Sequence, residues 1–171
     1  MILGKKVLAV SGSSRLARIL GLKRAEVYNS SYPECNLINL NFEDNCFDFC
    51  ISDQVLEHVK GDPYKAFEES IRVVKKGGYI CHTTCFINPK HGKNFGDYWR
   101  FTPEALALIS KSQNLNVIEV NGWGNKEVWS YIEMGFRSHI IPEDPDNPIY
   151  QLAMRNDRSW FIVTWILAQV Q

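Results

Sequence analysis

The sequence has no excess of charge of either sign. Its 171 residues include 19 Lys plus Arg and 19 Asp plus Glu, so the formal net charge is zero. Proteins dedicated to nucleic acid gain much of their affinity by neutralising phosphates with clustered cations. The balanced charge therefore predicts no nucleic-acid partner.

Long hydrophobic runs are missing as well. The longest run, residues 160–170, is interrupted by Thr164 and Gln169, whereas a helix that crosses a bilayer needs about 20 apolar residues. We expect a buried strand here and no membrane span. The first ten residues, MILGKKVLAV, lack the cationic head, apolar run and cleavage site of a secretory leader. With five cysteines, an odd number, this predicts reduced thiols and a cytoplasmic location.

Internal repeats and low-complexity tracts are also absent. The length suits one domain, which we place at residues 1–171. Apolar runs alternate with helical patterns, which predicts an α/β domain with a mainly parallel sheet. The expected strands cover residues 6–11, 25–29, 35–39, 47–52, 79–86, 115–120 and 160–167.

Helix signals are clearest at two places. Asp62 and Pro63 suit the cap and first position of a helix over 63–75, and Gly77 suits its end. Thr102 caps a helix over 103–110 in the same way. The sequence further predicts a short helix at 15–20, a helix at 127–138 and an irregular segment at 142–148. Too few residues separate the second and third strands for a parallel crossover, so we expect the helix between them to be missing.

Two segments resemble a known family. FEDNCFDFCISDQVLEHV (residues 42–59) is similar to the region around the fourth strand of class I S-adenosylmethionine-dependent methyltransferases, those of methyltransferase type 11. IRVVKKGGYI (residues 71–80) is similar to the pattern that follows it in that family, at the family's spacing. The resemblance implies a Rossmann-like, doubly wound α/β/α domain in three layers, with an antiparallel C-terminal strand. DYWRFTPEAL (residues 97–106) also resembles bacterial members that modify sugars or other surface glycans.

The resemblance implies where S-adenosylmethionine would bind. In open α/β sheets a ligand lies at the carboxyl ends of the strands, near the switch in strand order. The family's glycine-rich first turn corresponds to residues 9–14 (AVSGSS), which keep one glycine and no carboxylate. The second strand ends in Tyr28-Asn29-Ser30, where the family places an acidic residue. The implied cofactor contacts are Ser11, Gly12, Ser13, Tyr28, Asn29, Asn39, Leu40, Asn41, Asp53 and Gln54.

Three residues are candidate catalytic groups. His58 belongs to the family motif that faces the cleft. It is a candidate general base, with packing or hydrogen bonding that shapes the site as the alternative. His91 and Asp97 follow the fifth strand, on the acceptor side. Either could take a proton from the acceptor, or Trp99 and Phe101 could simply anchor this loop to the core.

No metal site is expected from Cys81, His82 and Cys85. On a strand, residues four apart are about 13 Å apart, whereas zinc–sulfur bonds are about 2.3 Å long. We expect His82 to be a core histidine and the cysteines to be small core residues.

Three functions remain open. The first is methyl transfer from S-adenosylmethionine to an oxygen or nitrogen of a small molecule or glycan. The second is a binding module in a glycan-assembly complex that keeps the fold but has lost catalysis, as the eroded glycine motif suggests. The third is NAD binding, although the first turn lacks the three-glycine fingerprint. A homo-oligomer is compatible with each.

Overall fold

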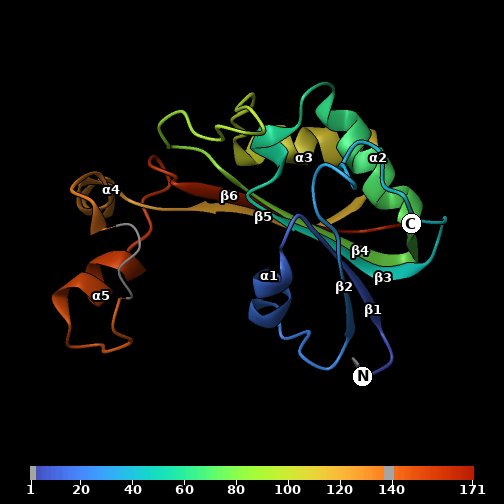
Figure 1. Ribbon diagram of the computed structural model, residues 1–171. Helices are drawn as coiled ribbons and strands as arrows, with labels where there is room; N and C mark the ends of the chain where they lie inside the picture. The colour runs from blue at the N-terminus through green and yellow to red at the C-terminus, as the bar shows by residue number, and fades with distance from the viewer. Residues whose placement is uncertain (1–2, 137–140) are drawn as a thin grey trace.

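A six-stranded sheet runs through the computed structural model, which describes residues 3–136 and 141–171 (Figure 1). Its spatial order is β2-β1-β3-β4-β6-β5. Neighbouring strands pair in parallel from β2 to β4, and β6 runs antiparallel to both of its neighbours. The predicted α/β sheet, mainly parallel with an antiparallel C-terminal strand, is confirmed. The strands are β1 (Lys6–Val10), β2 (Glu26–Asn29), β3 (Phe47–Asp53), β4 (Val74–Cys85), β5 (Asn116–Trp123) and β6 (Val163–Gln169).

Helices cover the two faces of the sheet unequally. On one face lie α2 (Pro63–Val73), α3 (Pro103–Ser112) and the short 3-10 helix η1 (Leu56–His58). The opposite face carries α1 (Ser14–Ile19) (Figure 1). The larger hydrophobic core lies under α2 and α3, and a smaller one lies under α1. The three layers are present, with one of them reduced to a single short helix.

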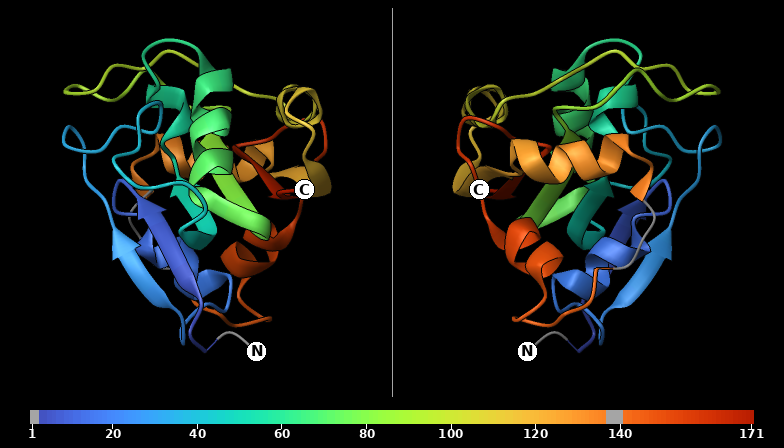
Figure 2. Two further views of the ribbon diagram at one scale, coloured as in Figure 1. Left: turned by 90° about the vertical axis from the view of Figure 1, so that its right-hand side faces the viewer. Right: turned by 90° about the vertical axis from the view of Figure 1, so that its left-hand side faces the viewer.

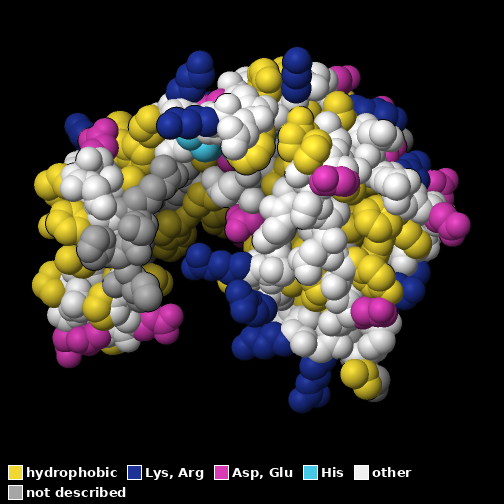
Figure 3. Space-filling view, viewed as in Figure 1, with side chains coloured by type: hydrophobic (Ala, Val, Ile, Leu, Met, Phe, Trp, Pro, Cys, Tyr) yellow, Lys and Arg dark blue, Asp and Glu magenta, His cyan; other side chains and the backbone are white. Residues whose placement is uncertain are grey.

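Two further helices form an arm beside β5 and β6. They are α4 (Lys126–Glu133) and α5 (Pro148–Met154). A hollow separates this arm from the α1 side of the sheet, and Lys and Arg side chains border it (Figure 3). None of the helices in the described ranges is long and apolar enough to cross a membrane.

The start of α2 agrees with the prediction, but its end does not. The Asp62 carboxylate accepts a hydrogen bond from the Tyr64 N–H at 2.8 Å, as a cap does. The helix ends at Val73 because Val74 already pairs with Phe47 as the first residue of β4. Gly77 has a φ of +79°, yet it lies within the strand and does not end the helix.

The strand predicted at residues 35–39 is wrong. This segment forms turns with one isolated bridge, between Asn36 and Asn39. The helix expected to be missing between the second and third predicted strands is absent, because residues 30–46 contain none, but the third strand that it would have reached is absent as well. Of the helix predicted at 127–138, residues 137 and 138 lie outside the described residues. The segment predicted to be irregular is so only up to Asn147, which caps α5 through bonds from Ile149 and Tyr150.

Gly78 in β4 has no room for a side chain. A Cβ there would lie 2.6 Å from Val74 Cγ1, 2.7 Å from the Asp48 carbonyl oxygen and 2.9 Å from the Lys75 carbonyl oxygen. Two of these atoms belong to the backbone and cannot rotate away. We expect Gly78→Ala to lower the free energy of unfolding by about 3 kcal/mol, the upper end of overpacking costs.

Urea denaturation measures this effect, and Gly77→Ala is the matched control. A Cβ at Gly77 meets nothing within 4 Å, so that variant carries only the strain of a positive φ, about 1 kcal/mol. Equal losses in the two variants would contradict the steric argument.

Candidate functional site

The candidate site lies where the strand order changes direction. From β1 the chain moves outward to β2, then returns to the other side of β1 with β3. Crevices at the carboxyl ends of strands at such a switch bind ligands in open α/β sheets. A cavity of about 420 Å³ is found there, within the range of small-molecule sites. Its lining residues are Ser11, Tyr32, Cys35, Asn36, Leu37, Gln54, Val55, His58, Val59, Lys60, Lys93, Asn94, Phe95, Gly96 and Tyr98.

The turn after β1 leaves open space above it. Ser11 and Gly12 have φ values of +53° and +81°, a region that glycine adopts at no steric cost. A Cβ built on Gly12 would meet no atom within 4 Å. Glycine is therefore favoured here by its backbone angle, and a ligand is free to approach the turn closely.

Ser13 joins the ends of β1 and β3. Its buried hydroxyl donates to the Val10 carbonyl oxygen and accepts from the Asp53 N–H at 2.8 Å. The Asp53 carboxylate in turn accepts from the Thr83 hydroxyl. These side chains, predicted as cofactor contacts, are occupied in holding the strand ends together, and only Gln54, the next residue, lines the cavity.

The two predicted contacts at the end of β2 lie outside the cavity lining. The Tyr28 hydroxyl donates to Glu26 Oε1 at 2.6 Å, which raises the pKa of Tyr28. Its ring packs edge-on against Phe47. Asn29 is exposed as the last residue of β2. The strand thus ends in the neutral Asn29, and no side chain of β2 lines the cavity.

The predicted contacts at Asn39, Leu40 and Asn41 line a different hollow, beside α2. Leu40 is buried, and its N–H donates to Glu69 Oε2 at 2.8 Å. This segment is therefore fixed to α2 instead of covering the strand ends. Of the ten predicted cofactor residues, the structure brings Ser11 and Gln54 to the cavity.

Two loops line the cavity with aromatic residues that sequence reasoning missed. Residues 30–46 and 86–100 extend toward the same side of the molecule (Figure 2). Tyr32 from the first and Phe95 from the second meet edge to face, with ring centroids 6.1 Å apart. Asn36, Lys60 and Lys93 complete the polar part of the wall. The sequence shows only that each loop contains an aromatic residue, which is too common a feature to place Tyr32 and Phe95 at a site.

His58 lines the cavity in a defined tautomer. Its Nδ1 lies within hydrogen-bond distance of the Gly96 carbonyl oxygen. A carbonyl only accepts, so Nδ1 carries the proton, and in the neutral ring the lone pair is then on Nε2. A Cβ on Gly92 would lie 2.8 Å from the His58 ring and 2.4 Å from the Gly96 carbonyl oxygen, so the loop holds the imidazole closely.

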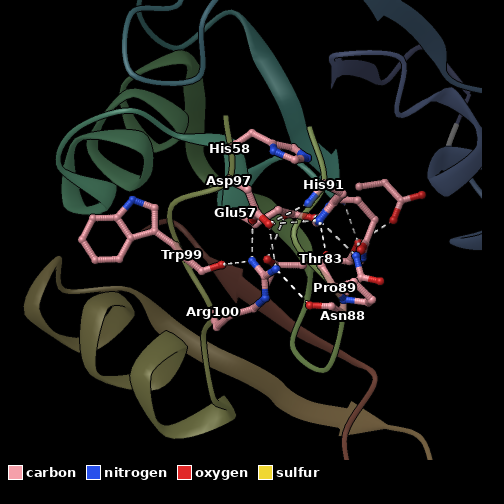
Figure 4. Close-up of polar contacts among 12 residues, drawn as sticks. Glu57, His58, Thr83, Asn88, Pro89, His91, Asp97, Trp99 and Arg100 are labelled. Atoms are coloured by element: carbon pink, nitrogen blue, oxygen red, sulfur yellow. Dashed lines mark hydrogen bonds and ion pairs between the residues drawn. The ribbon is translucent and has the colours of Figure 1, made fainter. Parts of the chain in front are cut away.

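His91 and Asp97 lie behind His58 and outside the cavity lining (Figure 4). The rings of His58 and His91 are 4.8 Å apart. Asp97 is paired with Arg100 through both carboxylate oxygens, and this guanidinium holds the pKa of the Asp97 carboxyl well below its ordinary value. Asp97 also accepts from the His91 N–H at 3.0 Å. These bonds connect residues within the same loop and so stabilise its conformation.

His82 is a buried core residue, as predicted. Its Nδ1 lies 2.8 Å from the Ser52 hydroxyl, and its ring packs against Phe67. Burial lowers its pKa to about 4. His82 therefore remains neutral near pH 7 and does not reach the cavity.

Known proteins support the family resemblance. The sequence profile of the methyltransferase domain matches residues 2–82. An uncharacterised methyltransferase of Schizosaccharomyces pombe is 42% identical over 60 residues, which are 35% of this chain and 21% of that protein. The chain thus matches about a fifth of that relative's length.

Solved structures share the fold at low sequence identity. One is a complex between the Haloferax volcanii Trm112 methyltransferase activator and a methyltransferase, with a TM-score of 0.65, 16% identity, and coverage of 98% of this chain and 82% of that one. Another is phosphoethanolamine N-methyltransferase 2 of Haemonchus contortus with S-adenosylmethionine, with a TM-score of 0.61, 18% identity, and coverage of 99% and 49%. At such identities the likeness concerns the fold alone. The profile match covers β1 to β3 and most of β4, so this part of the chain is similar in sequence to the methyltransferase domain, and the chain shares the fold of the solved methyltransferase structures.

Proposed function

We propose that this protein transfers a methyl group from S-adenosylmethionine to an oxygen or nitrogen of a small molecule or glycan. The observation that carries the proposal is the cavity between the carboxyl ends of β1 and β3. It lies at the switch in strand order, where this fold binds its ligands.

Polar side chains of the cavity fit a nucleoside in part. The Asn36 and Gln54 amides offer donors and acceptors for ribose hydroxyls and adenine, and Ser11 borders the turn. No acidic residue stands at the end of β2, so the charge-assisted part of a ribose contact is absent, on the order of 1 kcal/mol. We therefore expect binding, but weaker than that of a site with this carboxylate.

His58 is the residue we propose as proton acceptor. When bound, S-adenosylmethionine supplies an electrophilic methyl group on a sulfonium. An acceptor atom would take this methyl group, with a thioether as the leaving group, and would give up a proton. The proton of the acceptor passes to His58 Nε2, whose lone pair is free because Nδ1 donates to Gly96. Asp97 is the weaker candidate, since its bonds to Arg100 stabilise the ionised form.

The rim of the cavity favours an acceptor with negative charge. Lys60 and Lys93 line it, and none of its lining residues is an Asp or Glu. Opposite charge concentrates an anionic substrate at a cleft. An acidic sugar or a phosphorylated small molecule has the chemistry that this wall fits.

Isothermal titration with S-adenosylmethionine and S-adenosylhomocysteine tests the proposal. We expect saturable heat and a rise in melting temperature, because a ligand that binds the native state must stabilise it. Phe95→Ala removes one ring of the aromatic pair that lines the cavity and should weaken binding about two- to tenfold, since aromatic contacts contribute about 0.5–1.5 kcal/mol. Tyr131→Ala, at a half-exposed aromatic on α4 away from the cavity, is the control.

The binding module is the second candidate. The engaged Ser13 hydroxyl and the neutral Asn29 favour it, because two usual cofactor contacts are missing. If millimolar S-adenosylmethionine gives no heat and no rise in melting temperature, the methyltransferase proposal is wrong and the binding module is favoured. Recovery of binding in Asn29→Asp would instead identify a weakened cofactor site.

A further inference from the structure

Three potential metal ligands converge behind the cavity. They are Glu57 from η1, Cys85 at the end of β4 and His91 from the following loop, and one ligand atom of each lies within 4.8 Å of the others. Figure 4 shows Glu57 and His91 facing each other. None of the three lines the candidate cofactor cavity, so the cluster needs an explanation of its own.

Glu57 is a buried carboxylate with one unsatisfied oxygen. Its side chain is 0% exposed. Oε2 accepts from the Thr84 hydroxyl at 2.9 Å, whereas Oε1 has no hydrogen-bond partner. Burying a carboxylate with one oxygen unsatisfied is costly unless a cation or donor completes it. Oε1 is directed toward His91, 3.9 Å from Nε2.

His91 presents the matching nitrogen. Its Nδ1 has three polar neighbours: Asn88 Nδ2 at 3.1 Å, and the Pro89 carbonyl oxygen and Asp97 Oδ2 at 3.2 Å each. The two oxygens can accept the Nδ1 proton, and Arg100 holds Asp97 in place. This leaves Nε2 directed toward Glu57. Metal-bound histidines commonly have this arrangement, in which a carboxylate orients the ring through its other nitrogen. The side chain of His91 is 31% exposed, which gives an ion a path from solvent.

Cys85 supplies the third ligand and the remaining charge. It is a free cysteine, 3% exposed. Burial and the nearby Glu57 carboxylate raise its pKa to about 12, so a cation is needed to displace its proton near pH 7. A thiolate and a carboxylate together carry the charge that one divalent cation neutralises. Asp97 and Arg100 already neutralise each other.

We infer that Glu57, Cys85 and His91 bind one divalent transition-metal ion of the zinc class. Nitrogen, sulfur and carboxylate oxygen are zinc's ligands, with bonds of about 2.0–2.3 Å. Such bonds place ligand atoms roughly 3.3–3.8 Å apart in a tetrahedron, and the Glu57–His91 separation of 3.9 Å is slightly longer. Three protein ligands leave a fourth position for water or another ligand. The sequence prediction of no metal rested on Cys81, His82 and Cys85, and the cluster found in the described residues instead joins Cys85 to two other segments.

A second trio, His58, His91 and Asp97, overlaps this cluster. It suits a metal less well. His58 Nδ1 already donates to Gly96, and both Asp97 oxygens are bound by Arg100. The trio that contains the unpartnered Glu57 oxygen is the one that gains most from an ion.

Cobalt tests the site without any assay of methyl transfer. Protein stripped with a chelator and titrated with Co²⁺ should show a thiolate-to-cobalt charge-transfer band that saturates at one equivalent, and Zn²⁺ should abolish it. Zinc affinity is measured by competition with a chromogenic chelator. Cys85→Ser should lose the band and weaken zinc binding at least about tenfold. Glu57→Gln should keep the band but weaken zinc binding by a similar factor.

Cys46→Ser is the matched control, since Cys46 is a free cysteine outside the cluster. It should leave the band and the zinc affinity unchanged. The wild-type titration decides the matter even if a variant fails to fold. No charge-transfer band in the wild type, or the same band in folded Cys85→Ser, would overturn the inference. Neither result bears on S-adenosylmethionine binding, which has its own titration.

Discussion

Arg72→Ala should lower the free energy of unfolding by about 3–5 kcal/mol, the cost of leaving a buried charge without its partner. Arg72 bonds to both oxygens of Glu69, at 3.0 and 2.8 Å. The Glu69 side chain is 8% exposed, and Arg72 is the main reason that its pKa is lowered. The variant leaves this carboxylate buried, with the Leu40 N–H as its remaining close donor.

The same side chain holds a loop in place. Arg72 donates to the carbonyl oxygens of Leu40 and Phe42, each at 2.7 Å, and pairs with Asp44 at 2.8 Å. These contacts fix residues 40–44, which precede β3, onto α2. Loss of the loop contacts adds to the loss of the ion pair, so the effect should lie toward the upper end of the range.

Urea denaturation monitored by circular dichroism measures this effect. Lys65→Ala is the matched control on the same helix, because Lys65 is half-exposed and pairs with Glu68 and Glu69 at 3.2 and 3.7 Å. It should cost less than about 1 kcal/mol. Arg72→Lys should fall between the two, since an ammonium cannot reproduce the forked bonds. Similar losses for Arg72→Ala and Lys65→Ala would show that the pair with Glu69 is solvated.

His82 should make the protein sensitive to acid, by about 3 kcal/mol in total. Its pKa is about 4 in the folded protein, against 6.5 for an unperturbed histidine, and each pKa unit corresponds to about 1.4 kcal/mol. Between these values the unfolded chain binds a proton that the folded chain does not. Stability therefore falls as the pH drops from about 6.5 to about 4, and the loss is complete below that.

His82→Gln isolates this contribution. Glutamine can still hydrogen-bond the Ser52 hydroxyl but does not titrate. We expect the urea midpoint of the variant to depend less on pH between 6.5 and 4 than that of the wild type. His58→Gln, at a half-buried histidine, controls for the other imidazoles. Parallel pH profiles for the wild type and His82→Gln would refute the buried-histidine explanation.

The fold could be predicted where local signals and packing agree. Asp62 and Pro63 start α2 as predicted, and Thr102 caps α3 by accepting from the Ala105 N–H. The end of α2 was missed because pairing of Val74 with Phe47 overrides the local signal at Gly77. Asn147 and Pro148 carried a cap signal for α5 that the neighbouring prolines obscured.

The false strand at residues 35–39 has a tertiary cause. The segment contains Leu37 and is followed by Leu40, and such apolar residues are typical of a buried strand. Both are indeed buried, but in turns. Glu69 and Arg72, about 30 positions later, bind the backbone of Leu40 and so fix the segment to α2. No pattern within residues 35–39 contains that information.

The site was predicted less completely than the fold. Ser11, Gln54 and His58 follow strand ends, so topology alone brings them to the cavity. The wall formed by Tyr32 and Phe95 depends on how two loops meet. The cluster of Glu57, Cys85 and His91 likewise joins three segments, and only the folded chain shows that one oxygen of Glu57 is left without a partner.

The bridge made by Ser13 has a thermodynamic consequence. Because its hydroxyl connects Val10 to Asp53, the turns that carry Ser11 and Gln54 into the cavity are already joined in the folded chain. The two turns therefore lose conformational entropy when the chain folds, and they have less of it to lose when a ligand binds. Ligand binding at these turns should therefore cost less conformational entropy than binding at turns that are not connected in this way.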